Sequence, residues 1–285
     1  MLMQRVITAI VLLAVLALAL SSTSPWPFIA LLAAGASAAC WEWLRLTLSP
    51  RISSWLSVVA AIVAFAVMLA AANVWLGAWP QLLDCLNAVV RVLLPIVVVI
   101  WLVAPTVAVI RGRSDAAPAS WGWSLFSVPA VFCAWAALAL TFVSHGAWFV
   151  VSLLALVWIA DIAAYFAGRA FGKRKLAPKV SPGKTIAGAV AGVAGAVVWV
   201  WVSSMWNGSF GQVLIDYLSL PIGLLAAALL GILSIIGDLF ESLLKRRAGR
   251  KDSSGLLPGH GGVYDRIDAI LPVAPFALLL SGVLS

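Results

Sequence analysis

The chain has 285 residues, of which 64% are hydrophobic and 10% charged, and its mean hydropathy is +1.11. This composition excludes an ordinary soluble globular protein and is typical of a helical protein that crosses the membrane several times. The formal net charge of +8 indicates Lys and Arg kept in cytoplasmic loops, so we expect no nucleic-acid partner. The three cysteines form neither a CxxC pair nor a Cys/His metal spacing, which argues against a disulfide framework and a zinc site.

Apolar windows separated by Pro, Gly, Ser or charged residues predict about nine transmembrane helices in a single all-α membrane domain, residues 1–285. The expected ranges are 6–21, 27–44, 55–73, 89–110, 121–143, 147–167, 185–204, 218–238 and 269–284. With the N-terminus in the cytoplasm, seventeen of the eighteen Lys and Arg residues fall on the cytoplasmic side and only Arg91 on the other. We therefore expect a cytoplasmic N-terminus, a C-terminus outside and an odd number of crossings.

The polar residues divide this membrane domain into two halves. In residues 1–145 the loops are short, and Glu42, Asp84 and Asp115 are scattered without a recurring spacing, which predicts scaffold helices. Residues 146–285 contain two large cytoplasmic loops that hold most of the polar side chains. We therefore expect the second half to be the catalytic one.

A dense charged cluster occupies residues 237–268, with five acidic residues, six basic residues and one histidine. A charged side chain at the bilayer centre costs about 2.5–3.5 kcal/mol on insertion scales, so such a cluster is kept only at a wet interface or a functional cavity. Asp238 and Glu241 are three residues apart and share a helix face, and Asp265 and Asp268 repeat the spacing. Four carboxylates from two helix ends could bind Mg²⁺, which takes oxygen ligands and is completed by substrate phosphates.

Basic residues lie between these acids. Lys245 and Arg246 directly follow the first pair of acids, so we expect them to contact a phosphate-bearing substrate. Arg247 and Arg250 fit better in a solvated loop that is attracted to lipid headgroups.

Structural alternatives stay open at two points of the cluster. The acids could simply pair with neighbouring bases, Glu241 with Lys245 and Asp265 with Arg266. His260 lies among glycines whose N–H groups can approach an anion closely. Its imidazole could donate a proton, contact a phosphate or make a structural hydrogen bond.

A second polar region lies upstream of the cluster. Asp161 and Tyr165 fall near the cytoplasmic end of a predicted helix, and the run SPGKTIAG follows at residues 181–188. Its GKT resembles a P-loop, but the required earlier glycine is replaced by Pro178 and no strand is predicted before it, which excludes a P-loop ATPase. We expect a helix that starts at the Ser-Pro pair and binds an anion beside the lysine and threonine, with a simple helix cap as the alternative.

These residues resemble the phosphatidate cytidylyltransferase family, also called CDP-diglyceride synthases. The family's C-terminal signature runs S-x-x-K-R-x4-K-D, then a small residue, an apolar residue, H-G-G and D-R-x-D. The chain matches it in register with Ser242, Lys245, Arg246, Lys251, Asp252, Gly255, Leu257, His260, Gly261, Gly262, Asp265, Arg266 and Asp268. The SPGKT run, Asp161, Tyr165 and Arg169 are also similar to the family, so the motif resemblance covers the region 158–270. Ala187 departs from it, since many members have a polar or acidic residue there.

The resemblance implies transfer of the cytidylyl group of CTP to phosphatidic acid, which gives CDP-diacylglycerol and pyrophosphate, with Mg²⁺ as the cofactor. It also implies a homodimer in the bacterial inner membrane, with the active site facing the cytoplasm. Two alternatives are a CTP-dependent polyprenol kinase, which would transfer the γ-phosphoryl group to a lipid alcohol, and a transporter of organic anions that uses helix N-termini and buried cations.

The site residues are assigned from the local chemistry together with this resemblance. The expected metal ligands are Asp238, Asp265 and Asp268. The expected catalytic residues are Lys245, Arg246, His260, Asp265 and Asp268. The expected substrate-binding residues are Asp161, Tyr165, Ser181, Lys184, Thr185, Ser242, Lys251, Asp252 and Arg266. The cations would balance charge on the two substrates and on the departing pyrophosphate.

Overall fold

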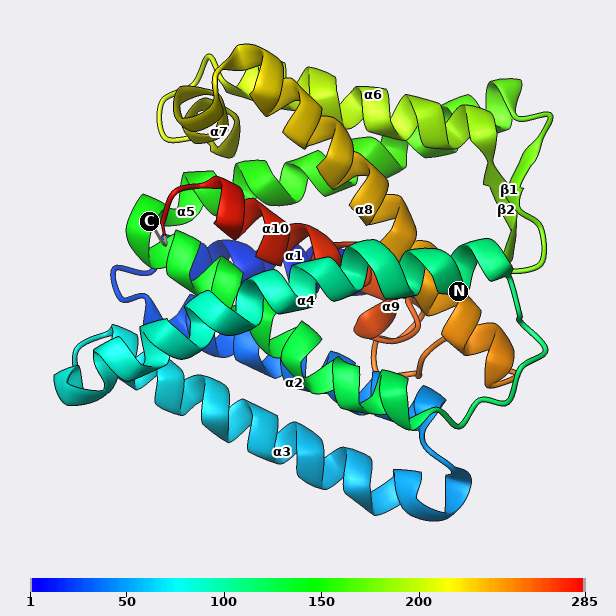
Figure 1. Cartoon of the computed structure of the whole chain (residues 1–285), viewed down its shortest axis with the longest axis horizontal. Coiled ribbons are helices and arrows are strands. Elements are labelled where there is room, and N and C mark those ends of the chain that lie inside the picture. Colours follow the sequence, from blue (N-terminus) through cyan, green and yellow to red (C-terminus); the bar gives the residue numbers. More distant parts are fainter. Residues whose placement is uncertain (1, 284–285) are drawn as a thin grey trace.

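A computed structural model of the chain describes residues 2–283 and shows a bundle of helices with one small hairpin (Figure 1). The helices are α1 (Leu2–Ser21), α2 (Trp26–Thr47), α3 (Pro50–Trp75), α4 (Leu83–Arg111), α5 (Trp121–Phe171), α6 (Ile186–Ser203), α7 (Phe210–Leu218), α8 (Leu220–Arg247), α9 (Tyr264–Ile267) and α10 (Ile270–Leu280), with a 3-10 turn at Pro80–Leu82. The strands are β1 (Lys175–Ala177) and β2 (Ser181–Thr185). The expected all-α class is confirmed, with this hairpin as the exception.

Within the described part of the chain, six helices are long and apolar enough to cross a membrane. They lie in Trp26–Thr47, Ile52–Trp75, Pro80–Arg111, Trp121–Phe171, Ile186–Ser203 and Leu220–Arg247. The chain is therefore a polytopic integral membrane protein, as its composition predicted. α1 begins and α10 ends at opposite ends of the bundle (Figure 1), as an odd number of crossings requires. The count of nine crossings and the orientation in the membrane stay predictions.

Two helices depart most from their predicted ranges. α5 joins the predicted helices 121–143 and 147–167, and its backbone is non-helical only where they meet, at Gly146 (φ 82°, ψ −176°), a conformation that glycine adopts because it lacks Cβ. α8 continues to Arg247, well past the predicted end of the helix at residue 238. Leu239 and Leu243 are buried in this extension, so apolar packing continues the helix through a charged stretch.

The hairpin corrects the expectation for the SPGKT run. β1 and β2 pair antiparallel, with Lys175 opposite Thr185 and Ala177 opposite Ser181. The run is therefore a strand, and the prediction that a helix starts at its Ser-Pro pair is wrong. α6 begins at Ile186 because Thr185 is its N-cap: the Thr185 hydroxyl accepts a 3.1 Å hydrogen bond from the Gly188 N–H. The helix cap that was the alternative for this threonine is thus present.

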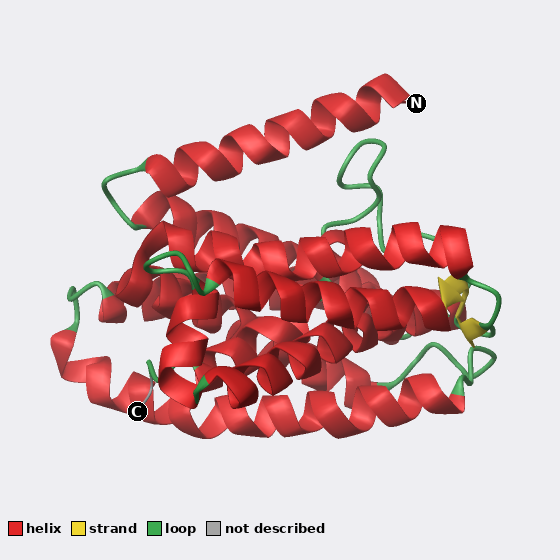
Figure 2. Cartoon of the chain, turned by 90° about the horizontal axis from the view of Figure 1, so that it is seen from above, coloured by secondary structure: helices red, strands yellow, loops and turns green. Residues whose placement is uncertain are grey.

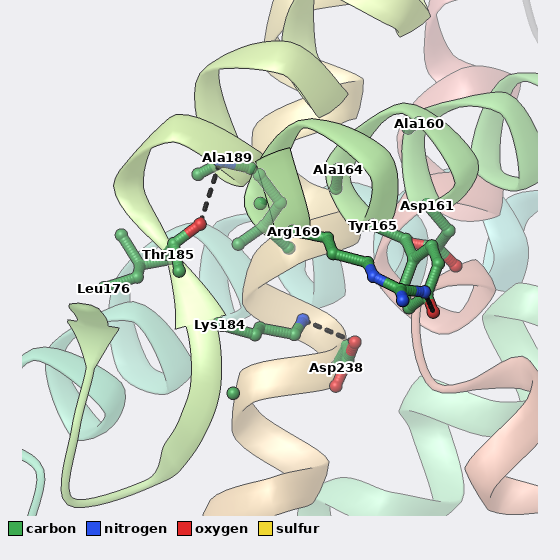
Figure 3. Close-up of a pocket in the computed structure, with 14 residues that line it drawn as sticks. Ala160, Asp161, Ala164, Tyr165, Arg169, Leu176, Lys184, Thr185, Ala189 and Asp238 are labelled. Atoms are coloured by element: carbon green, nitrogen blue, oxygen red, sulfur yellow. Dashed lines mark hydrogen bonds and ion pairs between the residues drawn. The ribbon is translucent and has the colours of Figure 1, made fainter. Parts of the chain in front are cut away.

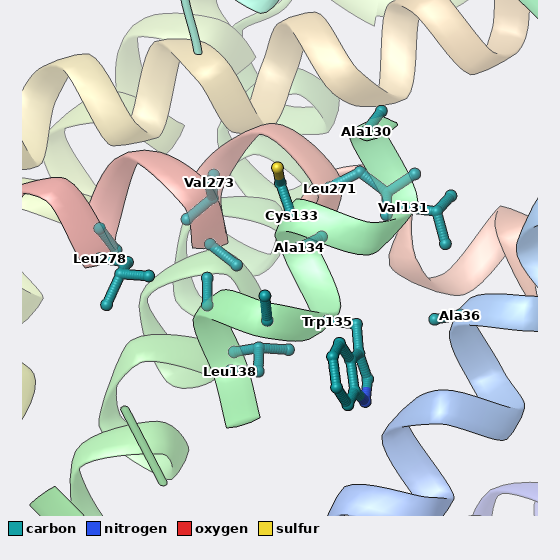
Figure 4. Close-up of a cluster of buried hydrophobic side chains, with 14 of the residues drawn as sticks. Ala36, Ala130, Val131, Cys133, Ala134, Trp135, Leu138, Leu271, Val273 and Leu278 are labelled. Atoms are coloured by element: carbon teal, nitrogen blue, oxygen red, sulfur yellow. The ribbon is translucent and has the colours of Figure 1, made fainter. Parts of the chain in front are cut away.

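Close packing among α5, α6, α8 and α10 fixes the framework of the second half. Buried side chains of α10, among them Leu271 and Leu278, lie over those of α5, among them Cys133 and Leu138 (Figure 4). α6 approaches α5 through glycines: a Cβ at Gly188 would lie 2.7 Å from the Ala164 carbonyl oxygen. These four helices therefore hold their polar ends at fixed positions relative to one another.

α1 lies at the edge of the bundle, apart from most of the other helices (Figure 2). It packs against α2, and the Thr8 hydroxyl donates a 2.8 Å hydrogen bond to the Pro258 carbonyl in the loop before α9. The first helix therefore reaches the loop that carries the C-terminal motif.

Candidate active site

A first cavity, with a volume of about 490 Å³, lies between α5, α6, α8 and the hairpin (Figure 3). Asp161, Tyr165 and Arg169 follow one another at intervals of four residues along α5, so they line the cavity from one helix face. Lys184 enters from β2 and forms an ion pair with Asp238 of α8. The hairpin thus fixes a lysine beside an acid of the C-terminal region.

A second cavity, of about 420 Å³, adjoins the first and is rich in acids. Its charged lining consists of Asp161, Asp238, Glu241, Lys245, Asp252, Asp265, Arg266 and Asp268. Asp161 and Asp238 line both cavities, so the two spaces meet at this pair of carboxyl groups. The arrangement brings the upstream motif region and the C-terminal motif region to one place.

The acids of the second cavity come from α8 and from the segment that returns before α10. Asp238, Glu241 and Lys245 are spaced by three and four residues and share one face of α8. The return segment approaches this face at Gly237, where a Cβ would overlap the Asp268 carbonyl oxygen. Glycine at residue 237 therefore permits Asp268 to lie beside Asp238.

Lys245 connects the two groups of acids. Its ammonium lies 2.6 Å from a carboxylate oxygen of Glu241 and 2.6 Å from Asp265 Oδ1. The alternative pairing of Glu241 with Lys245 is thus confirmed. Asp265 also pairs with Lys245, whereas the Arg266 guanidinium donates to the His260 carbonyl at 3.1 and 2.6 Å.

Asp265 is held by the loop that precedes it. Its Oδ2 accepts hydrogen bonds from the Ser253 N–H at 3.0 Å and from the Gly262 N–H at 2.7 Å. Burial raises the pKa of Asp265, but hydrogen bonding with Glu241, with Lys245 and with the Gly262 N–H outweighs this and holds the pKa below its usual value. A glycine N–H of the motif therefore does approach an anion, and that anion is the Asp265 carboxylate.

The environment of Asp268 shifts its pKa in the opposite direction to that of Asp265. Burial raises the pKa of Asp268 well above the usual value, and the nearby charge of Asp238 raises it further. One Asp268 oxygen accepts a 2.8 Å hydrogen bond from the Ala269 N–H. A cation between Asp238 and Asp268 would favour ionisation of both carboxyl groups.

Most of the predicted site residues line the two cavities. Those in the first are Asp161, Tyr165, Lys184, Thr185 and Asp238, and those in the second include Lys245, Asp252, Asp265, Arg266 and Asp268. Five predicted residues lie outside both linings: Ser181, Ser242, Arg246, Lys251 and His260. Ten of the fifteen predicted residues thus share these two linings, and the site assignment stays a prediction.

Two of these outlying residues make contacts that bear on their predicted roles. The Arg246 guanidinium donates to the Val180 carbonyl, just before β2, at 3.4 Å and so supports the hairpin. The His260 N–H donates to the Leu257 carbonyl at 2.9 Å, and its Nδ1 is buried without a hydrogen-bond partner among the described residues. The contact of His260 is made by its backbone, so the role of its imidazole stays a prediction.

Glu42 is the residue of this region that the sequence did not indicate. It belongs to α2, in the half expected to be scaffold, and is fully buried. Its carboxylate accepts hydrogen bonds from the loop at residues 253–264, which also holds Asp265. The available signal was a single acid within an apolar helix, which implies a buried partner.

Together, the fold and the cavities define a helical membrane protein with two joined cavities, one lined by cations and one rich in acids. Such a pair of cavities suits phosphate-bearing substrates. The comparison with known proteins narrows this class. The chain belongs to the cytidylyltransferase family, whose sequence model matches residues 3–284. The family resemblance seen in the motifs is therefore confirmed over nearly the whole chain.

Individual relatives agree with this assignment. The phosphatidate cytidylyltransferase of Pseudomonas aeruginosa is 37% identical over 289 aligned positions, which cover 98% of this chain and 97% of that protein. The phosphatidate cytidylyltransferase of Haemophilus influenzae is 45% identical over 46% of this chain and 45% of its own length. That of Bacillus subtilis is 38% identical over 50% of each chain.

Proposed function

We propose that this protein transfers the cytidylyl group of CTP to phosphatidic acid, giving CDP-diacylglycerol and pyrophosphate. Relatives with this enzyme name support the proposal, one of them matched over 97% of its length. The observation that carries it is the meeting of the two motif regions. Asp161 and Lys184 from the first region, and Asp265 and Asp268 from the second, line cavities that join at Asp161 and Asp238.

The cavities suit the main difficulty of this reaction, which is electrostatic. A phosphate monoester carries about −1.5 to −2 charges at neutral pH, so the lipid phosphate is a nucleophile that needs little help from a base. Its oxygen bonds to the α-phosphorus of CTP while the bond to the β-phosphate breaks and pyrophosphate leaves. Positioning and charge stabilisation dominate such transfers, and Lys184, Arg169 and Lys245 provide fixed cations around the junction of the cavities.

The donor set of the second cavity fits Mg²⁺. Asp238, Asp265 and Asp268 offer only oxygen ligands. Burial raises the pKa of Asp268, and a nearby cation would lower that pKa again. Among residues 2–283, no three His, Cys, Asp or Glu side chains are grouped as a preformed metal site. Mg²⁺ commonly uses one or two carboxylates and completes its shell with water and substrate phosphates, so these aspartates would hold it together with CTP. Bound there, the ion would neutralise phosphate charge.

The lipid substrate has a suitable space beside the first cavity. An apolar groove of about 800 Å³ lies between α4, α6 and α8 and shares Leu176, Ala189 and Ile235 with the first cavity. Arg111 and Lys179 are part of its lining. An apolar groove that ends at cations fits an acyl chain attached to a phosphate headgroup, so we assign it to phosphatidic acid.

Val190→Trp tests the assignment of the groove. Val190 lines the groove but not the first cavity, so an indole there is expected to raise the KM for long-chain phosphatidic acid about tenfold and leave the KM for CTP unchanged. The matched control is Val198→Trp, on the exposed surface of the same helix and outside these linings. Equal phosphatidic acid KM values in the two variants would contradict the assignment. Both values come from steady-state kinetics in mixed micelles.

Arg246→Ala is expected to lower turnover several-fold more than Arg247→Ala. Arg246 contacts the Val180 carbonyl at the start of the strand that carries Lys184, whereas Arg247 donates to the Arg113 carbonyl at 2.9 Å, away from the two cavities. Loss of the Arg246 contact would loosen the hairpin, and a misplaced catalytic group reduces the rate steeply. Equal turnover of the two purified variants would show that this division of the basic run is wrong.

The reaction itself is tested with purified protein, α-labelled CTP, phosphatidic acid and Mg²⁺. Label in CDP-diacylglycerol supports the proposal. A polyprenol kinase would instead transfer label from the γ-phosphate of CTP to a lipid alcohol, and a transporter would accumulate unchanged substrate in sealed vesicles. The acid-rich second cavity exceeds what the binding of an organic anion requires, which favours the enzyme.

The location and assembly of the enzyme are part of the same proposal. The hairpin and the C-terminal end of α8 lie at the end of the bundle where α1 begins (Figure 1). The distribution of basic residues predicts a cytoplasmic N-terminus, which would place the site at the cytoplasmic face of the bacterial inner membrane. The family resemblance supports a homodimer, which light scattering of the purified protein would test.

A further inference from the structure

The carboxylate of Glu42 binds the C-terminal loop at four points. Oε2 accepts hydrogen bonds from the Ser253 hydroxyl at 2.9 Å and from the Tyr264 N–H at 2.6 Å. Oε1 accepts from the Ser254 hydroxyl at 2.5 Å and from the Val263 N–H at 3.0 Å. A carboxylate offers about four acceptor positions, so these four donors match its hydrogen-bonding capacity. The loop is therefore closed around an acid that belongs to α2.

The same loop holds Asp265 from its other side. The Ser253 hydroxyl lies 2.9 Å from Glu42 Oε2 and 2.9 Å from Asp265 Oδ2, so one serine touches both carboxylates. The Ser253 and Gly262 N–H groups also donate to Asp265 Oδ2. This leaves Asp265 Oδ1 for Lys245. The orientation of Asp265 thus depends on a loop whose position Glu42 sets.

Two close contacts fix the loop against α2. A Cβ at Gly262 would overlap the Ser253 hydroxyl and the Glu42 carboxylate, so only glycine permits this approach. Tyr264 is fully buried and stacks on Trp43, the residue after Glu42, with ring centroids 5.2 Å apart and planes 9° apart. The loop therefore reaches Glu42 without an intervening side chain and stays there through aromatic packing.

We propose that Glu42 is a positioning residue of the active site, acting on Asp265 through Ser253 and the loop. This inference rests on the proposed function, since it concerns the orientation of an aspartate assigned to CTP and metal binding. Glu42 itself is not part of the lining of either cavity. Partners that orient a metal ligand typically change affinity or activity about 10- to 100-fold when replaced.

The test compares Glu42→Gln, Ser253→Ala and Ser254→Ala with the wild-type enzyme. The glutamine keeps the size of the side chain but presents an NH₂ group to two loop donors. Ser253→Ala and Ser254→Ala each remove one hydroxyl bound to Glu42, and only Ser253 also contacts Asp265. Three quantities are measured in detergent micelles: kcat, the KM for CTP, and the rise in melting temperature caused by Mg²⁺ with CTP.

We expect Glu42→Gln and Ser253→Ala to lower kcat/KM about 10- to 100-fold and to reduce the ligand-induced rise in melting temperature. Ser254→Ala should retain both properties, and the melting temperatures without ligand should differ little between the two serine variants. If Ser253→Ala and Ser254→Ala behave alike in activity and in the ligand-induced rise, Glu42 is only structural and the proposal fails. That comparison holds even if Glu42→Gln does not fold.

The outcome separates this inference from the proposed function. A folded wild-type protein that forms no CDP-diacylglycerol would overturn both. An active wild-type enzyme with equivalent serine variants would overturn only the role of Glu42.

Discussion

Asp265→Asn is expected to reduce CDP-diacylglycerol formation about a hundred- to a thousandfold while the protein stays folded. Asp265 Oδ1 lies 2.6 Å from the Lys245 ammonium, and Oδ2 accepts bonds from the Ser253 and Gly262 N–H groups. Asparagine retains a carbonyl oxygen for the two N–H groups, so the loop can keep its position. It places an NH₂ group toward Lys245 and removes the negative charge expected to bind the metal. Turnover and thermal unfolding of the purified variant measure the two effects.

The control for this variant is Asp216→Asn. Asp216 is an exposed acid of α7, outside both cavities, so its turnover should match that of the wild type. Near-normal activity of Asp265→Asn would remove Asp265 from the proposed metal ligands. A large loss of melting temperature in that variant would attribute its inactivity to misfolding instead, and Asp238→Asn, on the face of α8, would then decide the assignment.

Much of the site could be predicted because charge is conspicuous in an apolar chain. Asp238, Asp265 and Asp268 could not be placed in a membrane domain without a polar cavity or a cation, and all three do line one cavity, where Lys245 bridges Glu241 and Asp265. The helical spacing of Asp238 and Glu241 also predicted their common face. Helical spacing was therefore enough to predict which side chains lie together when one helix carries them.

The sequence could not predict contacts that join distant segments through the backbone. Glu42 and Ser253 are separated by 211 residues, and two of the four bonds to Glu42 come from main-chain N–H groups, which have no sequence signature. The observed contacts of Arg246 and His260 could not be predicted for a related reason. Each lies beside the motif acids in sequence, but the fold turns Arg246 toward the hairpin and uses the backbone of His260.

The fold shows the same limit at the ends of its elements. Hydropathy predicted where the helices lie. It placed the end of the helix that carries Asp238 at the first charged residues, but Leu243 and Leu244 are buried beyond that point and the helix continues. The hairpin is short and contains Pro, Gly and Lys, which disfavour strands, so its pairing depends on the packing around it rather than on intrinsic preference. This pairing matters for the chemistry, because it sets the position of Lys184.

Lys184→Met is expected to reduce turnover about a hundredfold and to raise the KM for CTP. The Lys184 ammonium pairs with Asp238 where the two cavities meet, so it lies where two anionic substrates would approach each other. Methionine keeps an unbranched apolar side chain but removes the charge, leaving Asp238 without its cation and the phosphates without a counter-charge. Steady-state kinetics with CTP and phosphatidic acid measure both parameters.

Lys175→Met is the matched control, because Lys175 is an exposed lysine of β1 that pairs with Thr185 across the same hairpin. The two variants change the net charge of the hairpin equally, so a nonspecific attraction of anionic substrate to this surface would make their effects equal. A hundredfold loss of turnover in Lys184→Met alone would instead indicate that the Lys184 ammonium acts specifically at its position beside Asp238. Full activity of Lys184→Met would exclude Lys184 from the charge balance of the reaction, and the cations of the site would then be Arg169 and Lys245.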